Sequence, residues 1–193
     1  MKEVELIIGD ETIDMISAMG FVEMPAIEEQ MFYFKSDKNK YVFGKVDEEQ
    51  GIVVSPAIIP EKRIVRFDPF TNEEYNVFFS AETVAKLSQN FLKSGNHINA
   101  TEQHVNPISG VHMIYSWIVE NEHDALITKY GFKDIPKGTW AVAYKIENED
   151  IKKKIKAGEI TGLSIEAWLT EKFSASTIYK ERIDEIKKLL NSI

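Results

Sequence analysis

The chain contains no cysteine. This absence excludes a thiol nucleophile, a disulfide framework and metal sites built from thiolates. Long apolar runs are missing too, since none approaches the roughly 18 residues that a membrane span requires. Met1 is followed by acidic and mixed residues, whereas a signal peptide needs a basic segment and an apolar core. These absences predict a soluble, cytoplasmic protein with no membrane partner.

Positive charge is in short supply. The sequence has 23 lysines and arginines against 31 acidic residues, which gives a formal net charge of -8. Phosphate groups repel such a surface, so we expect no broad binding to nucleic acid. The 193 residues, 44% of them hydrophobic, are enough for a well-cored domain of ordinary size.

Apolar and β-branched runs predict strands along much of the chain. These runs are YVFGKV (41–46), GIVVSPAII (51–59), RIVRF (63–67), YNVFFS (75–80), VHMIYSWIV (111–119), TWAVAYKI (139–146) and ITGLSIEAWL (160–169). Two helices are predicted between strands, one from an N-cap at Ser80 to Gly95 and one from an N-cap at Asn148 to Gly158. The mixture predicts an α+β domain with a mixed or antiparallel, barrel-like sheet and helices packed around it.

The two ends of the chain differ from this middle part. Near the start, the pattern predicts a short strand over 4–8 and a short helix over 11–19 with Asp10 as its cap. We expect 1–40 to be an N-terminal extension packed on the core and 41–172 to be the main domain. The amphipathic pattern at the end predicts a C-terminal helix within 173–193.

The stretch KAGEITGLSIEAW (156–168) carries the leading candidate for chemistry. On an extended strand, Ser164 and Glu166 point to the same face, and Gly162 leaves room for a substrate backbone to approach. A serine needs a base to take its proton, and histidine is the usual base near neutral pH. A strand serine with apolar neighbours is also compatible with a plain half-buried hydroxyl.

Four histidines are available as that base: His97, His104, His112 and His123. His104 leads because it lies in a polar loop just before a long strand. His112 lies within that strand, and the other two have polar, surface-like surroundings. A metal site made of His97, His104 and His112 is the rival use, although their spacing matches no compact ligand pattern. Trp117, Trp140 and Trp168 all fall on predicted strands, which favours packing in the core.

Several short motifs follow one another in order. They are Pro-x-x-x-Ile-x-Arg (60–66), Tyr-x-Val-x-Phe-Ser (75–80), Ser-Trp-Ile (116–118), Pro-Lys-Gly-Thr-Trp (136–140), a lysine helix ending in Ala-Gly-Glu (152–159) and Gly-Leu-Ser-Ile-Glu (162–166). With these motifs the chain resembles the phage serine proteases of the prohead (capsid maturation) protease group. The resemblance covers roughly residues 40–170.

The resemblance implies a serine endopeptidase with a fold related to herpesvirus assemblin and no cofactor or metal. It implies that Ser164 is the nucleophile and His104 the general base. The substrates would be phage scaffold and major capsid proteins, cleaved inside the prohead in the host cytoplasm, and a homo-oligomer is compatible with it. The alternative is a non-catalytic head-assembly or scaffold-binding protein on the same fold. It predicts that Ser164 and His104 lie too far apart to hydrogen-bond, even allowing for the looser geometry of an enzyme without substrate.

The third catalytic residue is less well defined. Relatives often carry a glutamate directly before Ser-Trp-Ile, where this chain has Tyr115. Glu166 is the first choice because it shares the face of Ser164, with Glu120 and Asp124 as alternatives. A structural role in which Glu166 pairs with a lysine is the other interpretation. The triplet Leu-Thr-Glu that ends at Glu171 suggests self-cleavage there, which would remove the C-terminal helix; a strand end followed by a linker is the other interpretation.

Overall fold

The computed structural model of the chain describes residues 2–25, 44–47, 51–68, 71–132 and 135–173, which form three four-stranded sheets and a few helices. The first sheet has the order β12 (Thr170–Phe173), β1 (Lys2–Ile7), β6 (Glu73–Phe78), β5 (Ile64–Asp68). The second has the order β3 (Gly44–Asp47), β4 (Ile52–Ile58), β10 (Trp140–Ile146), β9 (Val111–Ile118). The third has the order β11 (Gly162–Trp168), β2 (Met15–Val22), β7 (Ala100–Glu102), β8 (Asn106–Pro107).

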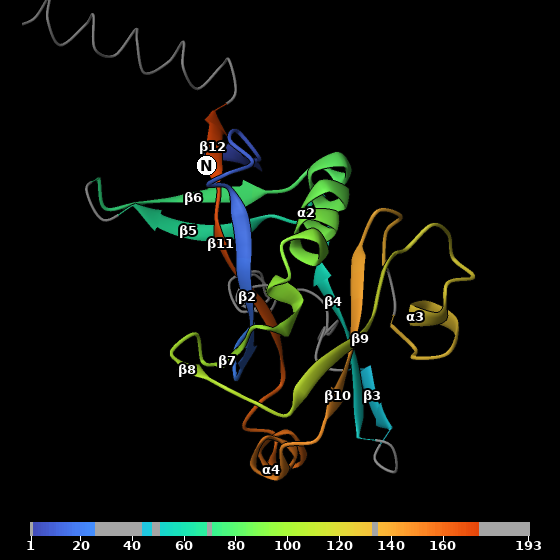
Figure 1. Cartoon of the computed structure of the whole chain (residues 1–193). Coiled ribbons are helices and arrows are strands. Elements are labelled where there is room, and N and C mark those ends of the chain that lie inside the picture. Colours follow the sequence, from blue (N-terminus) through green and yellow to red (C-terminus); the bar gives the residue numbers. More distant parts are fainter. Residues whose placement is uncertain (1, 26–43, 48–50, 69–70, 133–134, 174–193) are drawn as a thin grey trace, which may run out of the picture.

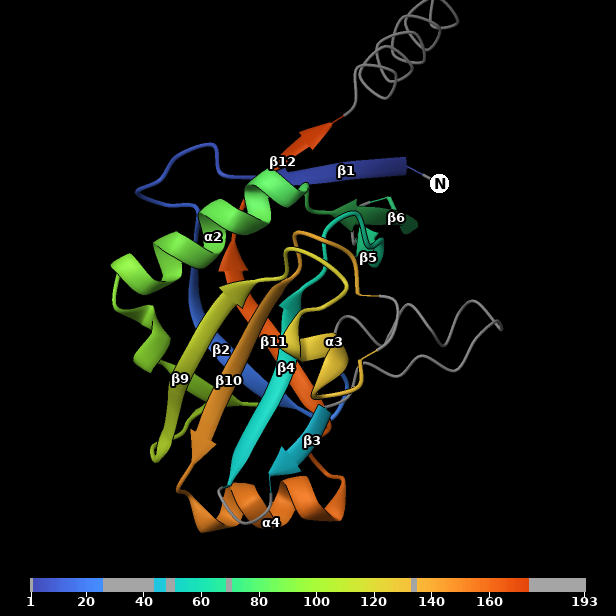
Figure 2. The ribbon, with the colours of Figure 1, turned by 90° about the vertical axis from the view of Figure 1, so that its right-hand side faces the viewer.

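The helices are α2 (Ala81–Lys93), the 3₁₀ turn η1 (Asn96–Ile98), α3 (Ala125–Thr128) and α4 (Glu149–Ala157). In Figure 1, α2 runs between the first and second sheets, and α4 lies at the opposite end of the molecule. Figure 2 shows the second sheet in front of β2 and β11, with α3 on its outer side. The α+β class is therefore confirmed.

The expected barrel-like sheet is not confirmed. Among the described residues none of the three sheets closes on itself. The strands β11 and β4 lie close to each other but belong to different sheets, so the backbone hydrogen bonds do not continue from one to the next. A barrel requires that continuous ring of paired strands. Where it would have to close, the structure has side chains and a cavity instead.

The core lies between the second and third sheets and under α2. Trp140 and Tyr144 of β10 are fully buried. The ring of Tyr144 meets Phe21 of β2 edge to face at 5.4 Å, and the ring of Trp140 meets Phe91 of α2 at 5.6 Å. The other face of β10 packs against a second cluster that includes Leu126 of α3. Because β10 is covered on both faces, its sequence is apolar except for Lys145.

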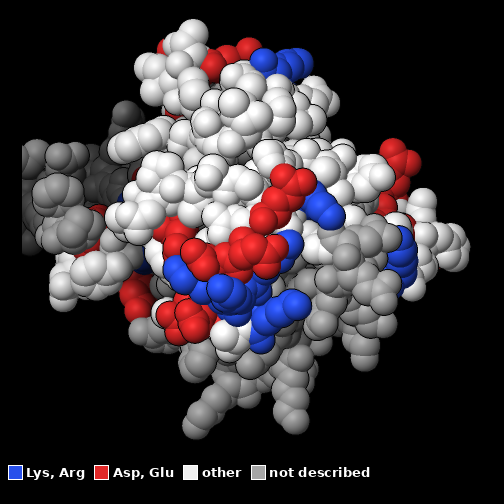
Figure 3. Space-filling view, turned by 60° about the horizontal axis from the view of Figure 1, so that its bottom comes forward, with Lys and Arg blue, Asp and Glu red and all other residues white. Residues whose placement is uncertain are grey.

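Both long predicted helices are present with their caps. The hydroxyl of Ser80 accepts a hydrogen bond from Thr83 N at the start of α2. Asn148 Oδ1 accepts from the amides of Asp150 and Ile151 at the start of α4, which ends at Gly158 in the left-handed conformation. Acidic side chains begin α4 and lysines end it, and the face of the molecule around this helix carries interspersed charges of both signs (Figure 3).

The predicted helix over 11–19 is wrong. Residues 15–22 form β2, which is an inner strand of the third sheet. Asp10 does bind an amide as a cap would, since its carboxylate accepts from Thr12 N at 2.9 Å. It caps only a turn, because pairing with β11 on one side and β7 on the other overrides a weak local helical pattern.

Trp168 also differs from the expectation. Trp140 is buried and Trp117 packs partly buried against the second cluster, but Trp168 is 74% exposed. It ends the paired part of β11, opposite Met15 and just past an irregularity in the register at Glu166 and Ala167. Its neighbours Ala167 and Leu169 line the inner cavity, whereas Trp168 lines the open cleft with Ser164 and Glu166, so the indole is on the solvent side of the strand.

Several expectations fall outside what the structure describes. The C-terminal helix within 174–193 and the start of the run over 41–43 lie outside the described residues, and the division into extension, main domain and C-terminal helix stays a prediction. For the part that is described, no helix is long and apolar enough to cross a membrane.

Candidate active site

Ser164 lies in the middle of β11, in a row of residues that crosses three strands. It is opposite Gly20 in the antiparallel pairing of β11 with β2, and Gly20 is beside Thr101 in the parallel pairing of β2 with β7. Residues paired in this way project to the same face of a sheet. Glu166, two residues after Ser164, projects to that face as well. The third sheet therefore gathers a serine, a threonine and a glutamate around a glycine.

His104 reaches this row from the turn that joins β7 to β8. Val105 N donates to Glu102 O at 3.0 Å, and the two residues between them, Gln103 and His104, have φ values of 52° and 59°. Positive φ at both central residues is what a type I′ turn requires, and asparagine and glycine usually supply it. Larger residues adopt this conformation at a cost of roughly 1–2 kcal/mol each.

Contacts with two other elements hold this strained turn in place. Gln103 N donates to Phe21 O of β2 at 3.0 Å. Lys154 of α4 forms an ion pair with Glu102, the residue immediately before the turn. Unusual backbone conformations persist where surrounding contacts fix them, and they concentrate at functional sites. The strain at His104 therefore marks this turn as a candidate for function.

The imidazole of His104 lies against the backbone of Gly20. A Cβ atom placed on Gly20 would be 2.6 Å from Cε1 and 2.7 Å from Nδ1 of His104, closer than carbon atoms approach in proteins. Only glycine leaves room for the ring at this position. Facing Cβ positions in an antiparallel pair are about 4.5–5.5 Å apart. The ring therefore lies on the face of the sheet that carries Ser164, over the residue paired with it.

Glu166 fixes the orientation of that ring. Its Oε1 atom lies 3.1 Å from Nδ1 of His104 and also accepts a hydrogen bond from the hydroxyl of Thr101. A carboxylate accepts hydrogen bonds, so Nδ1 is the protonated nitrogen of the neutral imidazole and Nε2 is the one with the lone pair. The Glu166 side chain is 25% exposed and that of His104 is 39% exposed, which leaves the histidine open to substrate.

Ser164 is half-buried and lines the same cleft as this pair. Within the described ranges no hydrogen bond joins its hydroxyl to His104. In enzymes without substrate such bonds are often long and tighten only in the substrate complex. The structure thus brings the three sequence-predicted site residues together on one face of one sheet.

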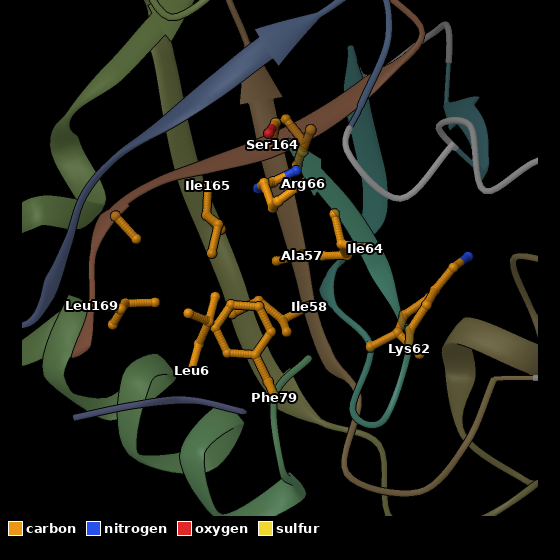
Figure 4. Close-up of a pocket in the computed structure, with 13 residues that line it drawn as sticks. Leu6, Ala57, Ile58, Lys62, Ile64, Arg66, Phe79, Ser164, Ile165 and Leu169 are labelled. Atoms are coloured by element: carbon orange, nitrogen blue, oxygen red, sulfur yellow. The ribbon is translucent and has the colours of Figure 1, made fainter. Parts of the chain in front are cut away.

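An open cleft and a more enclosed cavity adjoin Ser164. The cleft, of about 460 Å³, is lined by His104, Glu166 and Trp168 as well as the serine. The cavity, of about 200 Å³, lies where the three sheets meet. Arg66 of β5 lines both spaces, and Figure 4 shows its guanidinium beside Ser164.

The other candidate carboxylates have different positions. Both oxygens of Asp124 accept from Trp117 Nε1 at 3.1 Å, and Oδ1 also caps α3 by accepting from Leu126 N. Glu120 is exposed just after β9. Of the three carboxylates considered, Glu166 is the one in contact with His104.

The remaining histidines lie on other elements. His112 of β9 pairs with Glu147 at 3.5 Å, His97 lies in η1, and His123 precedes α3. Over the residues with a described structure, no group of three potential metal ligands comes together. The rival metal site made of His97, His104 and His112 therefore has no support in the geometry.

Three residues of the site escaped the sequence analysis: Gly20, Thr101 and Arg66. Arg66 ends the Pro-x-x-x-Ile-x-Arg motif, and that motif was a usable signal. Nothing local marks Gly20 or Thr101, because their importance comes from pairing with a strand more than 60 residues away along the chain.

A nucleophilic hydroxyl, a histidine and a carboxylate that orients the histidine are the groups that serine hydrolases use. Comparison with family models gives the same class. Residues 39–172 match the family described as "Putative phage serine protease XkdF", and the chain belongs to this family. Comparisons with curated proteins and with solved structures give no significant match.

Proposed function

We propose that the protein is a serine endopeptidase that cleaves phage scaffold and major capsid proteins during prohead maturation. The observation that carries the proposal is the position of His104. Its Nδ1 is held by Glu166 while its ring lies over Gly20, the residue paired with Ser164, and both His104 and Ser164 line the same cleft. Membership of a phage serine protease family supports a peptide substrate of phage origin. The proposed site of the reaction is the inside of the prohead in the host cell.

The proposed reaction follows from the protonation state of His104. Nε2 takes the proton of Ser164 as Oγ attacks the carbonyl carbon of the scissile peptide bond. The same proton then passes to the departing amine, and the C–N bond breaks to leave an acyl group on Ser164. His104 next activates a water molecule, which hydrolyses the ester and restores the serine. Glu166 stabilises the imidazolium in both halves of the reaction and remains a carboxylate.

The negative charge that develops on the carbonyl oxygen needs hydrogen-bond donors or a cation. Backbone amides near Ser164 are one source of donors. The guanidinium of Arg66 is the other candidate, because it stands beside Ser164 and borders both the cleft and the cavity (Figure 4). Its permanent charge would stabilise the oxyanion without any proton transfer.

The shape of the cleft suits a peptide. It is open along the side of β11, and exposed apolar side chains border it, Met24 at 61% and Trp168 at 74% exposed. Met24 follows the end of β2 that pairs with Gly162, whereas Trp168 is at the other end of β11. An extended peptide crossing Ser164 would therefore meet an apolar contact on either side of the scissile bond.

Self-cleavage at Glu171 is a further part of this proposal. Glu171 lies in β12, paired opposite Leu6 of β1, and its carboxylate accepts from Tyr75 OH at 3.1 Å. Proteases bind their substrates as extended segments. The strand β12 would therefore have to separate from β1 before the peptide bond after Glu171 could enter a cleft. Self-cleavage should therefore be slow unless the first sheet opens at its edge.

Co-expression with the scaffold and major capsid proteins encoded by the same phage tests the proposed function. We expect both proteins to be cut by the natural chain and by Ser109→Ala, a matched control on an exposed serine, and to stay intact with Ser164→Ala. Continued cutting by Ser164→Ala would refute Ser164 as nucleophile. Intact substrates with every variant would favour the non-catalytic assembly protein.

A further inference from the structure

The cavity next to Ser164 is unusual for its lining. Ten of the thirteen residues around it are apolar, and the other three are Ser164, Arg66 and Lys62. Its apolar wall comes from all three sheets, with Leu6 from β1, Ala57 from β4 and Ile165 from β11. In Figure 4, Ser164 and Arg66 stand at one end of this space, and Leu6 and Phe79 stand at the other.

An empty apolar space destabilises a fold in proportion to its volume, because the side chains around it lose their contacts. Protein cores are therefore normally filled. The volume of this cavity is about 200 Å³. An apolar cavity of about 150 Å³ is already large enough to bind benzene. The space is large enough for the side chain of leucine, isoleucine or phenylalanine.

Its position connects it to the candidate nucleophile. Leu163 and Ile165, the two neighbours of Ser164 in the chain, both line it. The cleft and the cavity share four lining residues: Arg66, Ser164, Ile165 and Ala167. A peptide that lies in the cleft with its scissile bond over Ser164 would therefore direct one side chain into the cavity.

We propose that this cavity is a specificity subsite that takes one large apolar side chain of the peptide substrate. The inference rests on the proposed function and deepens it, because it assigns the chemistry of one substrate position. Removing one methylene group from a side chain in an apolar pocket typically costs 10- to 200-fold in kcat/KM. Replacing leucine with alanine at that substrate position should therefore lower kcat/KM by about 100-fold or more.

The test uses the full chain and peptide diphenyl phosphonates, which react with an activated serine. The reagents differ only in the side chain next to the phosphorus or at one of the two preceding positions, with leucine, phenylalanine or alanine at each. At one of these positions the rate of inactivation should be at least 100-fold higher for leucine than for alanine. In Ala57→Leu, which fills the cavity, that preference should reverse. Ala85→Leu, a matched substitution on α2 away from the cavity, should keep it.

A second measurement does not depend on catalysis. In Ser164→Ala, N-acetyl-leucinamide should shift the methyl NMR signals of Ala57 and Ile58, whereas N-acetyl-alaninamide should not. Ala57→Leu should abolish the shifts, and Leu169→Phe, at the rim, is the substitute if Ala57→Leu fails to fold. Equal inactivation rates for leucine and alanine at every position, or no methyl shifts with N-acetyl-leucinamide, would overturn the subsite. Methyl shifts without any reaction at Ser164 would instead refute the proposed function and leave the apolar site intact.

Discussion

We predict that Gly20→Ala lowers the activity of the protein without lowering its unfolding temperature. The new Cβ atom would lie 2.6 Å from Cε1 of His104, while ordinary contact begins near 3.4 Å, so the ring must retreat by about 0.8 Å. That movement shifts Nε2 relative to Ser164 and lengthens the 3.1 Å contact between Nδ1 and Glu166. A misplacement of about 1 Å can lower kcat/KM by about 100-fold, and we expect a loss of that size.

Stability should respond in the opposite direction. Gly20 has no positive φ, so its backbone conformation suits alanine. Alanine within a strand is more favourable than glycine by roughly 0.5–1 kcal/mol, and the ring of His104 lies on an exposed turn where it can move. Gly20→Ala should therefore unfold at the same or a higher temperature than the natural protein while it loses most of its activity.

A double-mutant cycle tests the reasoning behind this prediction. Peptide cleavage is measured for Gly20→Ala, His104→Ala and the double variant, with thermal unfolding of each as the control. If glycine is needed only to seat the ring, Gly20→Ala should add nothing in the His104→Ala background. A full 100-fold loss in that background, or unchanged activity of the single variant, would refute the placement of His104.

Two further predictions concern hydrogen bonds to carboxylates. Thr101→Val removes one donor to Glu166 and should lower kcat about tenfold with KM unchanged, and Thr101→Ser should restore the rate; a change in KM alone would contradict the positioning role. Asp14 is buried, and its pKa is held below the usual 3.8, chiefly by the hydrogen bond from Asp10 N, with the hydroxyl of Thr170 contributing. The stabilising effect of the Asp14 carboxylate is therefore complete at pH values above 3.8, the usual pKa. It is lost as the pH falls through the lowered pKa of the folded protein. Asp14→Asn should cost about 2 kcal/mol near neutral pH and should flatten the acid side of a plot of unfolding temperature against pH, whereas an unchanged acid side would show that Asp14 makes no such contribution.

The parts of the fold that local chemistry decides were predictable from the sequence. Asn148 and Gly158 mark the ends of α4 because side-chain capping and a left-handed terminal residue are encoded within a few positions. The runs that became β9, β10 and β11 are long and rich in β-branched or aromatic residues, so they are strands in almost any setting. Ser164 and Glu166 share a face for the same local reason.

The rest depended on distant pairings. The first 25 residues contribute β2, and its register against β11 is what puts Gly20 beside Ser164. Periodicity could not reveal this, since residues 11–19 are compatible with either a helix or a strand until a partner is known. The position of His104 likewise depends on a positive φ at Gln103 and at His104. The sequence does not predict it, because neither residue is a glycine or an asparagine.

The exposure of Trp168 was hidden for a related reason. An aromatic residue on a strand is usually buried, and the sequence does not tell which face of a strand borders an open cleft. Here Ala167 and Leu169 face the inner cavity and Trp168 faces the cleft. The exposed indole next to a candidate nucleophile is then a feature of the site rather than of the core.

The most direct test of the central claim is covalent labelling of Ser164. The full chain is incubated with a fluorophosphonate, and the adduct is weighed by intact-mass spectrometry and mapped by peptide sequencing. We predict one adduct per chain on Ser164, with labelling strongly reduced in His104→Ala and Glu166→Gln but retained in Ser109→Ala. Absence of an adduct on the folded protein, or an adduct on another residue with Ser164 unmodified, would contradict the claim that Ser164 is a nucleophile activated by His104.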